Sequence, residues 1–403
     1  MSSPARAPVA GLTSPRILFL INEDRYFVSH RMDLARAARD AGCRVAVATR
    51  VTSYEQTIHD EGFEIFPIRL RRGLHGPVRE TVAFLDLVRL YRRLAPDLVH
   101  NIAIKHVIYG SLAARLAGVP LVVNSVTGLG SMFTQSAGRY RALKTLAMSV
   151  LRATLRRPGT RTIFQNPEDR DQFIAEGLVA PEGAVLIRGS GVDLARFAPR
   201  PRGEGTVIAI LPARMLWNKG VGEFVQTARL LRQAGVPVRC ALAGMVDAES
   251  SFGIPQAQLE EWAREGTVEW WGDQADMPAV YARTDIVVLP SYYGEGLPKV
   301  LLEGAAAGRA LITSDINGCR EIVRDGENGF LVPVKDVEAL AGAIRKLVED
   351  RALREKMGAA GRRIVAEHFS VEQVARETLD AYRGLLRGRW PPRASASSAA
   401  MPS

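Results

Sequence analysis

The sequence of 403 residues contains only three cysteines, Cys43, Cys240 and Cys319, which lie far apart in the chain. Their number is odd, and none stands in the spacing of a zinc site or another metal site. The sequence therefore does not carry the framework of paired disulfides that stabilises small secreted domains. The pattern is typical of the reducing cytoplasm, which is the expected location.

Long apolar runs are also missing. No uninterrupted run reaches the roughly 18–20 residues that a membrane-spanning helix needs. Residues 1–15 are rich in Ala, Pro and Ser but lack the apolar segment of a signal peptide. Residues 388–403 are similarly low in complexity, and we expect both ends to be disordered.

The sequence has no helix-turn-helix, zinc-finger or aromatic RNA-binding signature, although its net charge is +10. Residues 1–200 hold 28 Lys and Arg against 17 Asp and Glu, a net charge of +11, whereas the remainder carries −1. Such asymmetry indicates the kind of partner rather than the fold. Because the nucleic-acid motifs are missing, we expect no nucleic-acid partner and keep an anionic membrane surface as the candidate.

Short apolar segments alternate with helical patterns along the chain, which is typical of parallel, doubly wound α/β sheets. Strands are predicted over residues 16–21, 44–49, 63–68, 98–100, 121–123, 162–164, 206–211, 238–242, 268–270, 286–289 and 311–313. Helices are predicted over residues 29–41, 77–94, 107–117, 139–155, 167–175, 371–386 and from a cap at Asn218 to Gln233. Ligands of such sheets bind beyond the carboxyl ends of the strands.

A Gly- and Pro-rich break over residues 189–203 predicts a boundary between two domains. We assign residues 16–195 to an N-terminal domain and residues 196–369 to a C-terminal domain. Ser370 is expected to cap a last helix within residues 370–387.

Residues 291–303 carry the strongest signal for a binding site. They follow an apolar segment that reads as a buried strand, and Gly294 and Gly296 permit a sharp turn close to a ligand. Pro298 suits the first turn of a helix. A strand, a glycine-containing turn and a helix N-terminus together form a place where backbone N–H groups receive an anion.

Two carboxylates, Glu295 and Glu303, frame this turn with seven residues between them. Carboxylates would repel an anion, so we expect them to bind hydroxyl groups attached to it, such as those of a ribose and a hexose. Taken alone, the pair would fit two surface glutamates on a solvated helix equally well.

Upstream, residues 213–220 read Ala-Arg-Met-Leu-Trp-Asn-Lys-Gly. Arg214 can bind phosphate oxygens through two parallel hydrogen bonds, and Lys219 supplies a point charge nearby. These cations, the Glu-x7-Glu stretch and the segments 314–323 and 325–332 together resemble the large retaining glycosyltransferase family with the GT-B fold, often called family 4.

The resemblance is close in the second half of the chain and looser in the first. It implies two Rossmann-like domains facing across a cleft, with the last helix returning to the first domain. The implied reaction is transfer of a sugar, with retained anomeric configuration, from a nucleotide diphosphate donor, and a UDP-linked sugar is expected. The first βα turn, residues 23–25, resembles the subgroup that acts on lipid-diphosphate-linked sugars in bacterial surface polysaccharide assembly.

The resemblance also implies roles for the site residues. Arg214 and Lys219 would neutralise the departing diphosphate, together with the N–H groups that follow Glu295. Glu303 would bind the ribose and Glu295 the transferred sugar. The predicted catalytic residues are Glu295, Arg214 and Lys219. The predicted donor-binding residues are Arg214, Lys219, Gly294, Glu295, Gly296, Leu297 and Glu303.

No metal and no other cofactor is expected, because the two cations take the place of a metal ion. Asp169-Arg170-Asp171 matches a metal-binding Asp-x-Asp pattern of another glycosyltransferase class. It follows Asn166-Pro167, however, and acidic residues there suit the start of a helix.

Candidate acceptor-binding residues lie near the predicted strand ends of the first half. They are His30, Arg31, Lys105, Thr127 and Gly128. Thr127 stands where many relatives have His, so a hydroxyl contact with a sugar is expected instead. The cations would hold a second diphosphate, that of a polyprenyl-diphosphate-linked saccharide. Alternatively, His30 and Arg31 are polar residues that open a helix. His100, which follows the apolar residues Leu98 and Val99, fits a core histidine with one hydrogen bond equally well.

Residues 139–161 contain seven basic residues and no acidic one, with apolar residues at helical spacing. Such a helix is typical of a segment lying on an anionic bilayer, here the inner face of the plasma membrane. The alternative is a helix whose apolar face packs on the core. The predicted membrane-contacting residues are Arg139, Arg141, Lys144, Arg152, Arg156 and Arg157.

Other functions remain open on the sequence alone. They are a glycosyltransferase with a soluble or different lipid acceptor, a nucleotide-sugar-binding protein without catalysis, and a phosphorylase or epimerase of the same fold. The complete set of Arg, Lys and two Glu favours a transferase. The sequence leaves the identity of the sugars and the oligomeric state undetermined.

Overall fold

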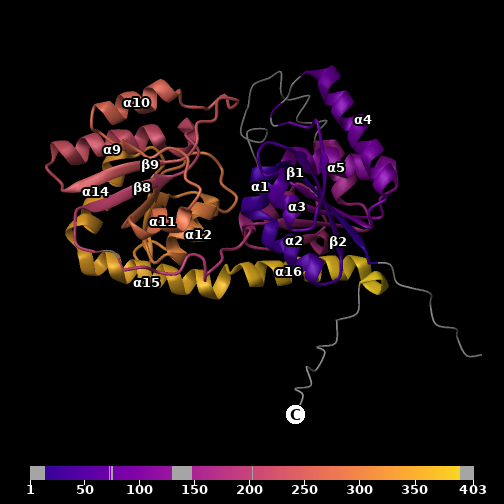
Figure 1. Ribbon diagram of the computed structural model, residues 1–403. Helices are drawn as coiled ribbons and strands as arrows, with labels where there is room; N and C mark the ends of the chain where they lie inside the picture. Colours follow the sequence, from indigo (N-terminus) through magenta and orange to yellow (C-terminus); the bar gives the residue numbers. More distant parts are fainter. Residues whose placement is uncertain (1–13, 72, 74–75, 129–147, 202, 391–403) are drawn as a thin grey trace, which may run out of the picture.

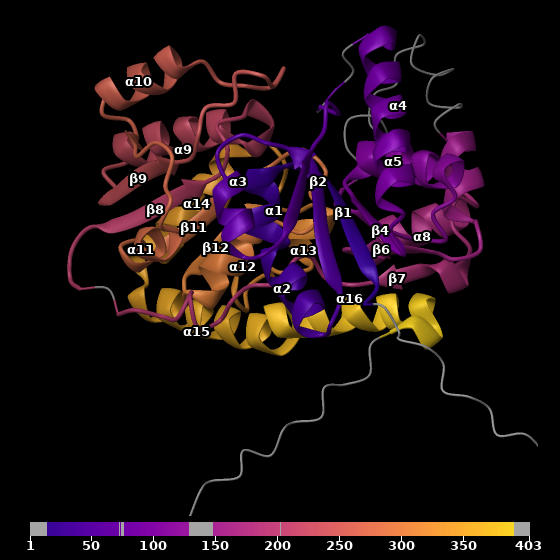
Figure 2. The ribbon, with the colours of Figure 1, turned by 45° about the vertical axis from the view of Figure 1, so that its right-hand side comes forward.

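The computed structural model describes residues 14–71, 73, 76–128, 148–201 and 203–390. Disorder is expected for residues 1–15 and 388–403, and most of both segments lies outside the described residues. The expectation is wrong at the start of the second segment, where Arg387–Arg389 form a 3-10 helix. The described residues form two parallel sheets, which Figure 1 and Figure 2 show side by side, each covered by helices on both faces. The predicted architecture of two doubly wound sheets is therefore confirmed.

The first sheet has the strand order β3-β2-β1-β4-β5-β6-β7, and all of its neighbouring strands are parallel. Its strands are β1 (Arg16–Glu23), β2 (Arg44–Arg50), β3 (Glu64–Pro67), β4 (Leu98–Ile102), β5 (Leu121–Val126), β6 (Thr160–Phe164) and β7 (Ala184–Leu186). Its helices are α1 (Asp24–His30), α2 (Met32–Asp40), α3 (Glu55–Asp60), α4 (Pro77–Leu94), α5 (Ile104–Ala117) and α8 (Pro167–Ala175).

The second sheet has the order β10-β9-β8-β11-β12-β13 and is also parallel. Its strands are β8 (Val207–Pro212), β9 (Val238–Ala243), β10 (Glu269–Trp270), β11 (Ile286–Leu289), β12 (Ala310–Ser314) and β13 (Gly329–Val332). Its helices are α9 (Val221–Gln233), α10 (Gln256–Arg264), α11 (Met277–Ala282), α12 (Lys299–Ala306), α13 (Asn317–Arg320), α14 (Val337–Glu349) and α15 (Arg351–His368).

The helix predicted over residues 29–41 begins earlier and is broken at Arg31 into α1 and α2. The early start is stabilised by Asp24, whose buried carboxylate accepts hydrogen bonds from the backbone of Arg25, Thr52, Ser53 and Tyr54. Burial alone would raise the pKa of Asp24, but the hydrogen bonds from Thr52 and Tyr54 bring it below its ordinary value.

The prediction of a helix cap at Asn218 is wrong. Residues Trp217–Lys219 form a short 3-10 helix, and α9 starts only after Gly220. Gly220 has a φ of +77°, which favours glycine, and its Cβ would lie 2.1 Å from the carbonyl oxygen of Pro290. The close approach of two loops therefore decides where α9 begins.

The last helix, α16 (Val371–Leu386), leaves the second sheet and packs on the first. The side chain of Ser370 caps it by accepting from the N–H of Gln373 at 3.2 Å. Val374, Leu379 and Tyr382 belong to the same buried cluster as Ile17 and Phe19 of β1. In Figure 1, α15 and α16 run beneath both sheets, so this segment joins the two halves a second time.

His100 of β4 is a core histidine, as one interpretation expects, but it has two hydrogen-bonding partners rather than one. Its Nδ1 lies 2.6 Å from the hydroxyl of Tyr382 on α16, and its Nε2 lies 2.7 Å from Ser125 Oγ. Burial lowers the pKa of His100 well below its ordinary value, so the ring stays neutral in the folded protein.

This burial makes the stability depend on pH. The unfolded chain takes up a proton on His100 near pH 6.5, whereas the folded chain does not. The folded state should therefore lose up to about 1.4 kcal/mol per pH unit below about pH 6.5 through this residue. We expect His100→Gln to flatten the pH dependence of the free energy of unfolding between pH 6.5 and pH 5, measured by urea titration. An unchanged slope would show that His100 also protonates in the folded state.

Candidate active site

The carboxyl ends of the two sheets meet at the turn that contains Glu295. This turn connects β11 to α12, and a Cβ at Gly296 would lie 2.5 Å from the carbonyl oxygen of Thr127 and 2.3 Å from Gln165 Oε1. Thr127 follows β5 and Gln165 follows β6, so both belong to the first sheet. From the other side, a Cβ at Gly318 would lie 2.0 Å from the carbonyl oxygen of Gly296. The turn is therefore held between the first domain and Gly318, with no room for a side chain at Gly296 or Gly318.

The loop that carries Lys219 is joined directly to this turn. The carbonyl oxygen of Asn218 accepts hydrogen bonds from Ser291 Oγ at 3.0 Å and from the N–H of Tyr292 at 3.2 Å. This junction brings the ammonium of Lys219 into an ion pair with the carboxylate of Glu295. Only 22% of the Lys219 side chain and 12% of the Glu295 side chain are exposed. The predicted pair of cation and carboxylate thus forms one cluster beyond the carboxyl ends of β8 and β11, beside the contact with the first domain.

Arg214 follows β8, and its guanidinium pairs with Asp247 in the loop after β9 at 2.5 Å. The side chain of Arg214 remains 37% exposed. The sequence prediction omits Asp247. The loops that carry Arg214 and Asp247 lie close together at Gly244, which has a φ of +156°. Its Cβ would lie 1.8 Å from the carbonyl oxygen of Ala213, so a larger residue would push these loops apart.

Glu303 lies in the second turn of α12, eight residues after Glu295, and 11% of its side chain is exposed. Its carboxylate accepts a hydrogen bond from the hydroxyl of Tyr281 at 3.1 Å and lies 3.8 Å from the ammonium of Lys299. Burial raises the pKa of Glu303, and Lys299 partly opposes this shift. Tyr281 is a further residue of the site that the sequence prediction omits.

Ion pairs connect the two domains around this cluster. Arg25 pairs with Asp273 at 2.7 Å, and Arg50 pairs with Glu249 at 2.8 Å. In both pairs the arginine comes from the basic first half and the acid from the second half. Part of the basic excess in the sequence therefore lies at the contact between the domains.

The predicted acceptor-binding residues lie in different surroundings. A Cβ at Gly128 would lie 3.3 Å from the backbone nitrogen of Gly296, so Thr127 and Gly128 line the turn that contains Glu295. His30 stacks on Tyr26 with the ring centroids 4.1 Å apart. Arg31 is 4% exposed, and burial lowers its pKa.

Lys105 is held within its own domain. Its ammonium donates to the carbonyl oxygens of Arg71 at 2.9 Å and Gly73 at 2.5 Å, and it pairs with Glu80 at 2.8 Å. An ammonium group has three N–H donors, and these oxygens match that number. The acceptor roles of these five residues stay predictions.

The predicted membrane segment is described only in part. Arg139, Arg141 and Lys144 lie outside the described residues. Residues 148–155 are helical, and Leu151 and Leu155 are buried. Arg152 donates to the carbonyl oxygen of Glu176 at 2.8 Å, and Arg156 donates to that of Gly177 at 3.3 Å, both just after α8.

These contacts favour the alternative in which the helix packs on the core, and Arg157 lies beside them with its Nη1 buried. Contact with a membrane through this segment stays a prediction. No helix within the described ranges is both long and apolar enough to cross a bilayer.

The Asp-x-Asp pattern belongs to the start of α8. Asn166 Oδ1 accepts from the N–H of Asp169 at 2.8 Å, and Asn166 Nδ2 donates to the carboxylate of Asp169 at 3.0 Å. Among the described residues, no group of three or more His, Cys, Asp and Glu side chains is placed to hold a metal ion. The three cysteines are buried free thiols.

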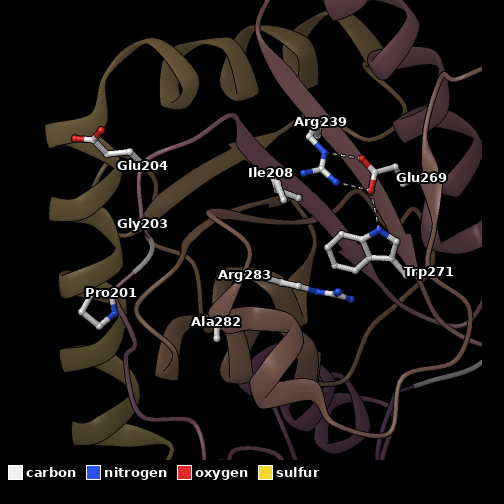
Figure 3. Close-up of a pocket in the computed structure, with 9 residues that line it drawn as sticks. All are labelled: Pro201, Gly203, Glu204, Ile208, Arg239, Glu269, Trp271, Ala282 and Arg283. Atoms are coloured by element: carbon white, nitrogen blue, oxygen red, sulfur yellow. Dashed lines mark hydrogen bonds and ion pairs between the residues drawn. The ribbon is translucent and has the colours of Figure 1, made fainter.

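Figure 3 shows a cavity of about 570 Å³ elsewhere on the second domain. It lies near Ile208 and Arg239, which stand at the amino ends of β8 and β9, opposite the strand ends that carry the cluster. Arg283 lies over the ring of Trp271 at 3.9 Å in this cavity. None of the predicted site residues lines it.

Comparisons with known proteins match both halves of the chain. Residues 16–163 match the family model described as glycosyl transferase 4-like, and residues 195–364 match the model described as glycosyl transferases group 1. Among solved structures, HepE of Anabaena in complex with UDP and glucose has a TM-score of 0.74 at 19% identity, covering 92% of this chain and 100% of that chain. The likeness supports the GT-B fold.

Two curated relatives are similar in sequence. An N,N'-diacetylbacillosaminyl-diphospho-undecaprenol alpha-1,3-N-acetylgalactosaminyltransferase of Campylobacter jejuni is 27% identical over 352 residues, covering 84% of this chain and 91% of that protein. A UDP-Gal:alpha-D-GlcNAc-diphosphoundecaprenol alpha-1,3-galactosyltransferase of Escherichia coli is 26% identical over 287 residues, covering 68% and 72%.

Two glycines of one turn give a matched test of the contact between the domains. Gly296→Ala should force the domains apart, because the new methyl group would meet the backbone of Thr127, whereas nothing lies within 4 Å of a Cβ at Gly294. We expect small-angle X-ray scattering to give a larger radius of gyration for Gly296→Ala and an unchanged one for Gly294→Ala. Equal radii for the two variants would mean that the domains do not close on this turn in solution.

Proposed function

We propose that the chain, a glycosyltransferase, extends a saccharide carried on a polyprenyl diphosphate. Its N-terminal half matches the glycosyl transferase 4-like model, and its C-terminal half matches the model of glycosyl transferases group 1. The proposed donor is a UDP-linked sugar, and the proposed transfer retains the anomeric configuration. The proposed place of reaction is the inner face of the plasma membrane. The main observation in support of the donor site is the ion pair of Lys219 and Glu295. The loops that carry these two residues are joined by the hydrogen bond from Ser291 to the carbonyl oxygen of Asn218.

In the proposed reaction the bond between the anomeric carbon and the diphosphate oxygen breaks, and a hydroxyl oxygen of the acceptor forms the new bond to that carbon. Negative charge develops on the departing phosphate, which takes up the proton of the acceptor hydroxyl. Arg214 and Lys219 supply positive charge on this side of the cleft, from loops fixed by Asp247 and Asn218. Charges that are already oriented stabilise the transition state without reorganisation of the protein. The low exposure of the Lys219 side chain strengthens its electrostatic interactions. We propose that these cations act without a metal ion.

The two carboxylates suit the neutral parts of the donor. Glu295 lies in the turn that faces the first domain, where it would bind hydroxyl groups of the transferred sugar. Glu303 lies in the second turn of α12 and would bind the ribose, with Tyr281 orienting its carboxylate. The donor would then lie along α12, with its sugar towards Thr127 and Gly128. HepE, which shares the fold, binds UDP and glucose, and this supports a UDP-linked donor.

The proposal of a lipid-linked acceptor is supported by the two curated relatives, whose names give diphosphoundecaprenol-linked substrates. An acceptor held by the first domain would meet the donor sugar where Thr127 and Gly128 touch the turn that contains Glu295. Lys105 would contribute only by exchanging one of its three oxygen partners for a phosphate.

Replacing Arg214 or Lys219 with Ala should lower the rate of sugar transfer by about 10²-fold or more, the scale of losing one contact to transition-state charge. Radiolabelled transfer measures this effect. Arg229→Ala is the matched control, because Arg229 is an exposed residue paired with Glu265 on the surface. Wild-type activity should persist in EDTA. Normal turnover in both variants would remove the assignment of the donor site.

The acceptor is tested with one saccharide in two forms, free and linked to a polyprenyl diphosphate. We expect transfer from UDP-sugars to the lipid-linked form and little to the free form, because the diphosphate supplies charge for binding. Hydrolysis of the donor in the absence of acceptor reports separately on the donor site. Preference for the free saccharide would exclude the lipid-linked proposal, and binding of the donor without any turnover would favour a non-catalytic protein.

A further inference from the structure

The outer face of α4 carries an exposed apolar stripe. Val78, Val82 and Leu85 follow one another at the i, i+4 and i+7 spacing of one helix face, and their exposed fractions are 75%, 38% and 43%. The opposite face of the helix, with Leu87 and Tyr91, is buried. Figure 1 and Figure 2 show α4 at the periphery of the first domain, on the side away from the second domain.

The second half of the same outer face is basic. Arg89, Arg92 and Arg93 continue the stripe towards the end of α4, and all three are exposed. Arg92 donates to the carbonyl oxygen of Leu116, a residue that is itself 52% exposed. Neither Arg92 nor Arg93 pairs with an acidic side chain among the described residues.

A cavity of about 360 Å³ opens beside this face, between α4 and the segment that follows β3. Arg69, Arg89 and Arg93 are among its lining residues, together with apolar side chains such as Leu87 and Leu90. The lining contains one acid, Asp86, which pairs with Arg69 at 3.2 Å and with Arg89 at 3.0 Å. Three cations around one carboxylate leave the cavity with an excess of positive charge.

The start of α4 is fixed at the acceptor side of the first domain. Glu80 in the first turn pairs with Lys105, which lies at the start of α5, directly after the carboxyl end of β4. The carboxyl ends of parallel strands lie at one edge of the sheet. The apolar half of α4 therefore begins at the same edge as Thr127, which follows β5.

We propose that the outer face of α4 lies on an anionic lipid bilayer, with Val78, Val82 and Leu85 inserted between the lipids and the arginines on their phosphates. A helix with one apolar and one basic surface suits this position, and arginines near an anionic leaflet add to the attraction. The inference rests on the proposed function, because a lipid-linked acceptor brings the enzyme to a membrane.

A second copy of the chain fits this face less well than a lipid surface does. A twofold contact would place the same patch of both copies together. The arginines of one copy would then meet either the arginines or the apolar side chains of the other, and neither arrangement gives them acidic partners. Anionic lipids supply the apolar and the negative components that the face requires. Lys105 becomes, in this arrangement, the residue that positions the membrane helix beside the acceptor site.

The test is co-sedimentation of the full chain with vesicles of phosphatidylcholine alone and of phosphatidylcholine with phosphatidylglycerol. We expect binding to the anionic vesicles and its loss at high salt. The apolar variant V78S/V82S/L85S and the basic variant R89Q/R92Q/R93Q should each bind at least tenfold more weakly. The matched controls are Val334→Ser, which removes an apolar side chain that is 42% exposed on the second domain, and R229Q/R239Q/R351Q, which removes the same charge there.

A second measurement separates this proposal from the proposed function. Hydrolysis of the UDP-sugar should be the same in the α4 variants and the wild type, while transfer to a lipid-linked acceptor in vesicles should fall. Failure of the wild type to hydrolyse any UDP-sugar would count against the proposed donor. The vesicle experiment would still show whether the outer face of α4 binds lipid.

Three results would overturn the proposal for α4. One is unchanged vesicle binding by the apolar variant. Another is loss of binding in R152Q/R156Q with normal binding by both α4 variants, which would move the membrane surface to residues 148–155. The third is absence of vesicle binding together with a dimer that the apolar variant converts to monomer, which would identify the occupant as a second copy.

Discussion

The structure depends on one close contact, the passage of the backbone at Gly296 between the two domains. Thr127 and Gln165 approach it from the first domain, and Gly318 approaches it from the second. No side chain fits there, so the position of Glu295 is tied to the distance between the domains. The carbonyl of Asn218 extends the same constraint to Lys219. We therefore expect the contact between the domains and the positions of Glu295 and Lys219 to change together.

The electrostatics of the domain contact fit this coupling. Arg25 and Arg50 reach from the first domain to Asp273 and Glu249 of the second. Each of these pairs is partly exposed, and such pairs contribute about 0–1 kcal/mol each. They orient the domains without locking them in place. Glu249 lies two residues after Asp247, the partner of Arg214, so one loop contacts both the first domain and a cation of the donor site.

Local pattern was sufficient where local interactions decide the structure. α4, α8 and α16 have the predicted bounds, because a first-turn proline in α4, Asn166 and Pro167 in α8 and Ser370 in α16 mark their starts. Prediction failed where distant contacts decide. The break at Arg31 and the start of α9 depend on loops brought together by the fold. β7 and α3 are too short to show a periodic pattern of apolar residues. The sequence prediction also omits β13, α14 and α15, although Asp336 and Asp350 cap the two helices. Of the site, Arg214, Lys219, Glu295 and Glu303 were visible in the sequence, whereas Asp247 and Tyr281 became visible only as their partners.

The basic excess of the first half illustrates the limit of reading charge from sequence. A run of basic residues and a basic surface are different things, because hydrogen bonds and burial decide which charges face a partner. Arg152 and Arg156 lie in the most basic run and donate to carbonyl oxygens after α8, much as Arg92 donates to that of Leu116. The apolar residues Leu151 and Leu155 of the helix that carries Arg152, however, are buried. Arg25 and Arg50 have acidic partners across the cleft. Arg92 and Arg93 are interleaved with apolar residues in the sequence and are less conspicuous there, yet they lie exposed on the outer face that also carries Val78. Exposed basic residues together with adjacent exposed apolar surface are therefore the basis on which we propose α4, rather than the most basic run, as the lipid-facing helix.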